Sequence, residues 1–309
     1  MPRSIILGNG NMLATFDANL QMRDLYYPFV GMEDHTQYGD MHRIGVWIKN
    51  TDGSTNFKWL EDETWRIDPN YKPETLVGHT ILRNDELGLL VKAEDSVHPV
   101  HNILLRHFSV TSTDGQDKEV RFFFHHDFHI YGDKQKDTAF YEPYTNTVIH
   151  YRQQRYFLVG GQTTNPTSCR TGQDGGEFRS ILHSKQKTKS CGINSWSIGK
   201  SEYQGLEGTW RDAEDGELSE ATIEQGSVDS TVAIHSNVTA DSETHVEMWL
   251  CLGSSLDEVI ELQQYIFEET PKGIQRNSHN YWKSWVNKTE RNFASLSEAA
   301  VSRYKRSLL

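Results

Sequence analysis

The residues best suited to chemistry form one run, Phe122-Phe123-Phe124-His125-His126-Asp127-Phe128-His129-Ile130. A run this rich in aromatic residues predicts a β-strand, on which successive side chains point to opposite faces. The alternation places His125, Asp127 and His129 on one face and His126 on the other. Imidazole and carboxylate groups can hold a divalent ion, but no fourth ligand is identifiable. We therefore expect a polar surface that contacts another molecule, and no metal.

A dense acidic stretch follows later in the chain. Two carboxylates that meet in space can hydrolyse a glycosidic bond, and the spacing in the sequence alone does not reveal such a pair. A catalytic carboxylate usually lies in a buried cleft, which this polar, glycine-bounded stretch does not predict. We interpret it as a solvated loop and assign no catalytic residue to it. Its members are Glu207, Asp212, Glu214, Asp215 and Glu217.

Four tryptophans could form a sugar platform. Ring faces stack on the C–H faces of sugars, and neighbouring acids and amides bind the hydroxyl groups. A tryptophan buried in a β-sandwich core is the commoner arrangement, so no single position identifies a sugar site. The four candidates are Trp59, Trp65, Trp196 and Trp210.

Composition excludes several classes of protein. The 309 residues include 31 Lys+Arg and 43 Asp+Glu, a net charge of −12, which argues against nucleic-acid binding. The sequence lacks nucleophile-elbow, P-loop, Rossmann and zinc-protease motifs, so we expect no cofactor. No stretch approaches the ~20 apolar residues that span a bilayer, and the N-terminus does not resemble a signal peptide. These features predict a cytoplasmic protein without a membrane partner.

The three cysteines, Cys169, Cys191 and Cys251, show no metal-binding spacing. We expect ordinary reduced thiols, while a bridge between Cys169 and Cys191 stays open because spacing does not determine its geometry.

The elements that must position these residues are mainly strands. Between residues 1 and 252 short β-branched and aromatic runs alternate with turn sequences such as Asp52-Gly53 and Asp114-Gly115, which predicts stacked antiparallel sheets. Residues 162–208 are compatible with weak strands or with long loops. The predicted strands are Arg43–Ile48, Leu87–Ala93, Asn102–Val110, Val120–Ile130, Thr147–Tyr151, Arg155–Val159, Ser230–Ile234 and Thr244–Leu252.

From residue 253 the period changes to that of helices. Ser255 and Glu258 form a capping box, Pro271 ends this helix, and a second helix follows. A third helix is expected to begin at a Ser295–Glu298 capping box. We divide the chain into a sandwich (1–252), linker helices (253–294) and the start of a truncated helical domain (295–309). The last helix has apolar residues and no C-cap, which favours a further domain, although a short docking helix that ends the protein is the alternative.

Several blocks carry a family resemblance. Residues 7–13, 23–31 and 122–130, together with 207–219 and 304–309, resemble the N-terminal domain of prokaryotic glucoamylase-like proteins of glycoside hydrolase family 15. The resemblance implies a large antiparallel super-β-sandwich followed by linker helices. It also implies an enzyme that cleaves α-glucosidic bonds in starch-type glucans, dextran or trehalose by inversion. The family's catalytic residues would lie in a helical barrel beyond Leu309, so this 309-residue chain is expected to be inactive alone.

In that architecture we expect three segments to border the catalytic barrel and its carbohydrate: the loop from Tyr27 to His35, the region around the polar strand, and the stretch from Trp210 to Glu217. The alternative is a free-standing carbohydrate-binding or scaffold protein. Separated from the barrel, the chain is expected to self-associate through its uncovered helix face. The individual candidates are His126, Asp127, His129, Asp137, Tyr141, Trp210 and Asp212.

Overall fold

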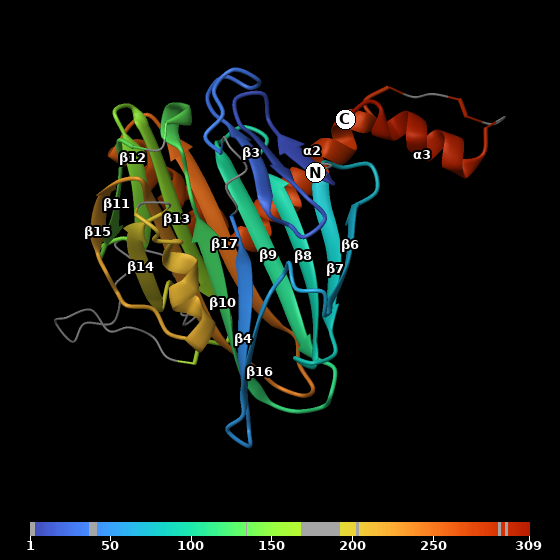
Figure 1. Ribbon diagram of the computed structural model, residues 1–309. Helices are drawn as coiled ribbons and strands as arrows, with labels where there is room; N and C mark the ends of the chain where they lie inside the picture. Colours follow the sequence, from blue (N-terminus) through green and yellow to red (C-terminus); the bar gives the residue numbers. More distant parts are fainter. Residues whose placement is uncertain are drawn as a thin grey trace.

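The computed structural model describes residues 4–36, 42–133, 135–167, 192–201, 204–289, 292–293 and 296–309. The chain forms three antiparallel sheets followed by helices, so the predicted mainly β class is confirmed (Figure 1). Cys169 and Cys191 lie outside the described residues, and Cys251 is a buried free thiol.

The largest sheet has nine strands in the order β15-β11-β12-β13-β17-β9-β8-β7-β6. Most neighbours are consecutive in the sequence, as expected for strands joined by tight turns. Along the sheet the strands are β15 (Ile223–Gly226), β11 (Asp137–Glu142), β12 (Thr147–Arg152), β13 (Arg155–Thr163), β17 (Thr244–Gly253), β9 (Ile103–Ser112), β8 (Leu89–Val97), β7 (Val77–Asn84) and β6 (Trp65–Tyr71).

A five-stranded sheet in the order β14-β16-β10-β4-β5 packs against it, and a small sheet of β1, β2 and β3 covers one end. Among the described residues of the weakly patterned region 162–208, Ser195–Lys200 form the edge strand β14, and Gln162 and Thr163 end β13. The strands of the second sheet are β14 (Ser195–Lys200), β16 (Val228–Val238), β10 (Lys118–His126), β4 (Ile44–Asn50) and β5 (Thr55–Trp59), and those of the third are β1 (Ile5–Gly8), β2 (Leu13–Phe16) and β3 (Met22–Tyr26).

Strand register defines two ends of the sandwich. The turns 72–76, 98–102 and 153–154 lie at one end together with residues 127–133, which follow β10; we call this the His126 end. The turns 51–54, 85–88, 113–117 and 239–243 lie at the other, which we call the Asp114 end. In Figure 1 the His126 end is at the top.

In the described part of the chain the strands are followed by the helices α1 (Leu256–Glu269), α2 (Pro271–Val286) and α3 (Glu298–Arg306). The Ser255 hydroxyl accepts a hydrogen bond from the Glu258 amide, so α1 begins where the capping box predicted. Apolar residues of α1 and α2 cover the outer face of the nine-stranded sheet around Trp249. None of the helices in the described part of the chain is long and apolar enough to cross a membrane.

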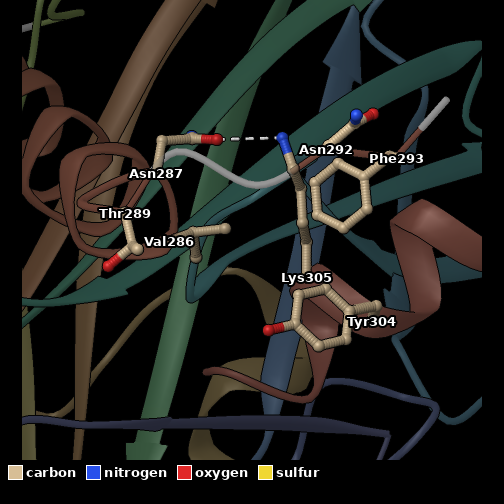
Figure 2. A pocket seen from close by; sticks show the side chains of 7 residues that line it. All are labelled: Val286, Asn287, Thr289, Asn292, Phe293, Tyr304 and Lys305. Atoms are coloured by element: carbon tan, nitrogen blue, oxygen red, sulfur yellow. Dashed lines mark hydrogen bonds between the residues drawn. The ribbon is translucent and has the colours of Figure 1, made fainter.

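Helix α3 differs from the prediction at its start. Its N-cap is Ser297, whose hydroxyl accepts a hydrogen bond from the Ala300 amide, while Ser295 lies outside the described residues. The helix is attached to the turn after β6, because Lys305 bonds Glu74 at 2.5 Å and Arg306 donates to the Thr75 carbonyl at 3.0 Å. A cavity of about 660 Å³ separates α3 from the end of α2 and is bridged by the Lys305–Asn287 hydrogen bond (Figure 2).

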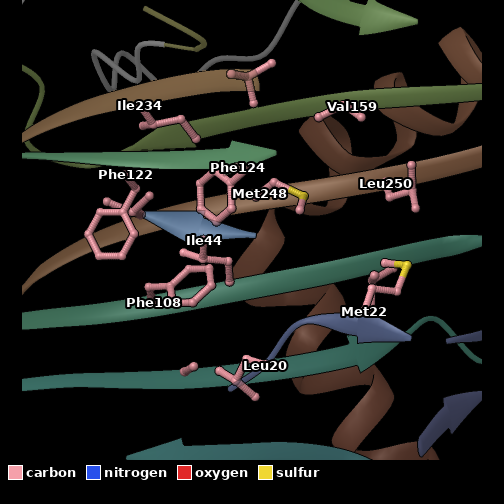
Figure 3. Packing of buried hydrophobic residues seen from close by; sticks show 14 of the residues in the cluster. Leu20, Met22, Ile44, Phe108, Phe122, Phe124, Val159, Ile234, Met248 and Leu250 are labelled. Atoms are coloured by element: carbon pink, nitrogen blue, oxygen red, sulfur yellow. The ribbon is translucent and has the colours of Figure 1, made fainter. Parts of the chain in front are cut away.

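The main core lies between the two large sheets. Figure 3 shows Phe122 and Phe124 of β10 packed with Phe108 of β9 and with aliphatic side chains from both sheets. Phe123 points the other way, into a smaller cluster with Trp47 and Trp59 on the outer face of the five-stranded sheet. The predicted alternation along β10 is therefore confirmed for these three residues.

Candidate functional site

The predicted polar row lies at the His126 end and is buried. Strand β10 stops at His126, four residues before the predicted end, and the chain turns at Ile130–Gly132, where Tyr131 takes a left-handed conformation with φ of 62°. The side chains of His125, His126, Asp127 and His129 are only 2 to 6% exposed. The expectation of an exposed polar surface at these positions is therefore wrong for this chain.

Three histidines surround the ring of Phe128. Its centroid lies 4.8 Å from that of His42, 5.7 Å from that of His126 and 5.0 Å from that of His150. Burial lowers the pKa of all three, that of His150 to about 3, and the neighbouring histidines act in the same direction. The His150 Nε2 atom lies 2.7 Å from the Ser230 hydroxyl. These rings are neutral at pH 7 and pack as part of the core.

His125 and Asp127 make separate pairs. His125 Nε2 lies 2.9 Å from the Asp229 carboxylate, which also accepts a hydrogen bond from the Thr209 amide at 2.6 Å. Asp127 lies 3.5 Å from His129 Nε2 and accepts a hydrogen bond from Ser201. Burial is the main cause that raises the pKa of Asp127. Within the described ranges no three potential ligands are arranged to hold a metal ion.

Asp137 begins β11 beside this cluster. One carboxylate oxygen accepts a hydrogen bond from the Ile130 amide at 2.9 Å, and Arg152 approaches the other at 4.0 Å. Burial raises its pKa to about 7, against the opposing effects of the Ile130 hydrogen bond and Arg152. Asp137 thus fixes the backbone at Ile130, at the end of the polar segment. A carboxyl group with a pKa near 7 is also suited to proton transfer where a reactant can reach it.

Around Tyr131 two arginines form a cation–aromatic cluster. The guanidinium of Arg155 lies 5.1 Å from the Tyr131 ring and 5.7 Å from the Tyr27 ring, and that of Arg152 lies 5.6 Å from Tyr131. Arg155 also makes a bidentate pair with Glu33 at 2.6 and 3.1 Å. These contacts join the loop 27–36 to the turn between β12 and β13.

Trp210 and Asp212 lie on a different face, in the short 3-10 helix η3 (Thr209–Asp215) that covers the outer cluster of the five-stranded sheet. The Trp210 ring is half-buried between the guanidinium groups of Arg43 at 4.1 Å and Arg211 at 3.9 Å, and its edge contacts Trp59. Asp212 accepts a hydrogen bond from the Ser219 amide at 2.7 Å. Both side chains therefore hold η3 in place.

We expect Trp210→Ala to lower the free energy of unfolding by about 1 to 2 kcal/mol, because the Trp59 contact and two cation–aromatic contacts are lost. Asp212→Ala is expected to cost less than about 1 kcal/mol, since the half-exposed Ser219 amide then bonds water. Urea unfolding followed by circular dichroism measures both. Equal stabilities of Trp210→Ala and the unchanged protein would contradict this assignment.

The remaining candidates are internal. Tyr141 stacks on Trp196 with ring centroids 3.4 Å apart, and its hydroxyl donates to Asn146. Trp196, Trp59 and Trp65 are buried, so these three tryptophans are not surface platforms for a sugar. Their rings instead fill cores, which is the commoner role of tryptophan in a sandwich.

The structure thus brings His126, Asp127, His129 and Asp137 together. Trp210 and Asp212 lie together on another face, and Tyr141 lies apart from both groups. Sequence reasoning missed the partners of these residues, which come from distant strands and loops. No local pattern marks them: they are His42, His150, Arg152 and Asp229.

Comparison with known proteins gives a consistent fold. No protein-family model matches the chain. Over 163 residues, half of the chain, it is 29% identical to an uncharacterized glycosyl hydrolase of Methanocaldococcus jannaschii, of which the match covers 23%. Among solved structures it is similar to a bacterial glucoamylase complexed with acarbose, with a TM-score of 0.65 and 13% identity over 99% of this chain and 40% of that one. A family GH92 α-mannosidase from Bacteroides thetaiotaomicron gives a TM-score of 0.48 at 10% identity, covering 100% of this chain and 38% of the mannosidase.

The chain spans less than half the length of each of these proteins. The glucoamylase likeness shows that the whole described sandwich, with its helices, has the fold of one portion of a glycoside hydrolase.

Proposed function

We propose that this chain is the non-catalytic N-terminal domain of an inverting glycoside hydrolase of family 15, which supports and borders a catalytic helical barrel. The observation that carries the proposal is the extent of the glucoamylase likeness, which includes 99% of this chain but only 40% of the solved enzyme. We propose that a domain equivalent to the remaining portion of that enzyme follows Leu309.

The geometry of the described residues supports a non-catalytic role. The buried carboxylates Asp127, Asp137 and Asp229 each have a positioning partner. Around η3, the exposed Glu207 and Glu214 pair with Arg211, and Asp212 and Asp215 accept hydrogen bonds from backbone amides. An inverting enzyme needs an acid and a base about 6.5 to 9.5 Å apart around a space for sugar and water. Of two cavities beside α3, one has no acid among its lining residues, and the other is lined by Glu298 and by Glu74, whose carboxylate is paired with Lys305.

The proposed substrates of the full-length protein are α-glucans or trehalose-type sugars, and its proposed location is the cytoplasm. We expect His126, Asp127, His129 and Asp137 to shape the barrel-facing end from beneath, by holding residues 127–133 in place, rather than by contacting sugar. We likewise predict that Trp210 and Asp212 border the barrel by positioning η3. Tyr141 is predicted to do so by positioning β11.

The test is glucose release from maltooligosaccharides and from trehalose, comparing the 309-residue chain with the complete product of its gene. We expect hydrolysis by the complete product and none by the 309-residue chain. Glucose release by the 309-residue chain would place the carboxylate pair here and overturn the proposal. A reading frame that stops at Leu309 would favour the free-standing carbohydrate-binding protein instead, which equilibrium dialysis with maltooligosaccharides would then test.

A further inference from the structure

Large apolar side chains are exposed at the His126 end. Phe29, Val30 and Met32 are 58, 38 and 84% exposed, and all three lie on the loop 27–36. Val100, in the turn between β8 and β9, is 71% exposed. Single exposed apolar residues are ordinary, but several at one end of a chain with a net charge of −12 indicate a surface that another molecule covers.

The Asp114 end provides the contrast. The turns 51–54, 85–88, 113–117 and 239–243 carry none of the exposed large apolar side chains, although the β11–β12 turn, which register directs to the same side, carries Tyr144. These four turns carry seven acids, of which Glu86, Asp85 and Asp114 pair with Lys58, Arg83 and Lys118, and the charged groups keep that end hydrated. The acids are Asp52, Asp85, Glu86, Asp114, Asp117, Asp241 and Glu243.

The loop that displays the apolar side chains is held by its own polar groups. The Met32 amide donates to the Phe29 carbonyl at 3.0 Å, and the Tyr27 amide donates to the Glu33 carbonyl at 3.2 Å. The Glu33 carboxylate is paired with Arg155, as described above. Because these contacts fix the backbone of the loop before binding, they lower the entropy cost of forming an interface.

The C-terminus lies at this same end. Helix α3 is bonded to the turn 72–76, which register places at the His126 end, and Figure 1 shows the C-terminus and the loop 27–36 both at the top of the sandwich. A domain that continues from Leu309 would therefore start beside the exposed apolar residues, without having to cross the length of the sandwich.

We propose that Phe29, Val30, Met32 and Val100 form the contact surface for the catalytic domain that follows Leu309. This inference rests on the proposed function, which supplies that domain, and it adds the interface. Protein interfaces typically have an apolar centre and a polar rim. Here the apolar side chains are bordered by the ion pairs Arg155–Glu33 and Arg152–Asp133.

Hydrogen exchange of the complete product and of the 309-residue chain tests the interface without any activity measurement. Peptides that cover 28–33 and 99–101 are expected to exchange at least about tenfold more slowly in the complete product. Peptides that cover 51–54 and 113–117, at the Asp114 end, are expected to exchange equally in both. Equal exchange at the two ends would overturn the inference, even if the complete product hydrolyses α-glucosides.

Paired variants give an independent measurement. Met32→Glu is expected to change the melting temperature of the 309-residue chain by no more than about 2 °C, because the side chain is exposed there. In the complete product it should abolish the slow exchange of 28–33. Tyr144→Glu is the matched control, since Tyr144 is 79% exposed on the turn between β11 and β12, and it should leave that exchange unchanged.

The outcomes separate the two proposals. A complete product without glycosidase activity, but with protected 28–33, overturns the proposed function and leaves an interface of the stated kind. A glycosidase whose residues 28–33 exchange freely overturns the interface alone. If the 309-residue chain dimerises in sedimentation experiments, Met32→Glu makes it monomeric, and the complete product shows no protection, the partner is a second copy and the inference is wrong.

Discussion

Below pH 6.5 the protein is expected to lose stability steeply, because three core histidines must stay neutral to remain buried. Burial lowers the pKa of His42, His126 and His150, and the charged groups that act on them are other histidines and Arg106, all of which also disfavour protonation. The unfolded chain, in which histidine titrates near 6.5, binds more protons than the folded chain between that pH and the folded pKa. Stability therefore falls as the pH falls through this window.

The size of the effect follows from linkage. Each histidine that is neutral when folded and charged when unfolded costs about 1.4 kcal/mol per pH unit. For His150 the window extends from 6.5 down to about 3. A domain has only about 5 to 15 kcal/mol of stability, so three such groups are enough to unfold it in mild acid.

Asp137 works in the opposite direction. Its folded pKa is raised to about 7, so the folded chain binds the extra proton between that value and about 4, where the unfolded carboxyl titrates. Its contribution to stability is present at low pH and is lost as the pH rises through 7. Asp127, whose pKa burial also raises, acts in the same sense.

Urea unfolding at a series of pH values between 7.5 and 4.5 measures these contributions as slopes. His150→Gln is expected to make the acid loss shallower by about 1.4 kcal/mol per pH unit, and Asp137→Asn to make it steeper by the same amount. Because the readout is the slope, a constant loss of stability in either variant does not affect it. Parallel curves for both variants and the unchanged protein would show that these groups do not control acid unfolding.

Much of the fold was predictable from local sequence. All eight predicted strands correspond to strands of the structure, with ends shifted by a few residues, and α1 begins at its predicted cap. The alternation of Phe122, Phe123 and Phe124 between two cores was also predictable, since one strand period decides it. These features depend only on neighbours in the chain.

Other strands were missed for identifiable reasons. Strand β6 contains Pro69, which argues against a strand interior, yet β6 lies at the sheet edge, where a missing amide is tolerated. The four-residue strands β1, β2 and β15 are too short to show a period. At α3 two serines compete as caps, and the local sequence did not distinguish Ser297 from Ser295.

The candidate site was predicted as a set of residue types but not as a set of partners. Strand periodicity placed His125 and Asp127 together, whereas His125 pairs with Asp229, 104 positions away. Exposure was misjudged because polar side chains usually lie outside, and these find buried partners across β16 and β12. The division into residues 1–252, 253–294 and 295–309 stays a prediction.

Asp229 is expected to be the most sensitive polar position, and Asp229→Ala should lower the free energy of unfolding by about 3 kcal/mol. The side chain is fully buried, and its Oδ2 atom contacts both His125 Nε2 and the Thr209 amide. Removing it takes away the acceptor that the Thr209 amide and His125 Nε2 share, and a buried donor that loses its acceptor costs about 1 to 3 kcal/mol. The Thr209 amide begins η3, so the loss also detaches Trp210 from the sheet.

Two measurements distinguish this role from a general loss of packing. Hydrogen exchange of residues 209–219 should be faster in Asp229→Ala than the fall in global stability alone explains, because η3 opens locally. Asp215→Ala is the matched control: it removes an exposed carboxylate of the same helix, which accepts a hydrogen bond from the exposed Glu217 amide, and should change stability by less than about 1 kcal/mol. Gly208→Ala should reproduce the local opening, since a Cβ there would lie 2.5 Å from Asp229 Oδ2 at a backbone φ of 116°.

If Asp229→Ala and Asp215→Ala cost the same, Asp229 does not anchor η3. In that case its position beneath Trp210 would reflect only the packing of β16 against β10.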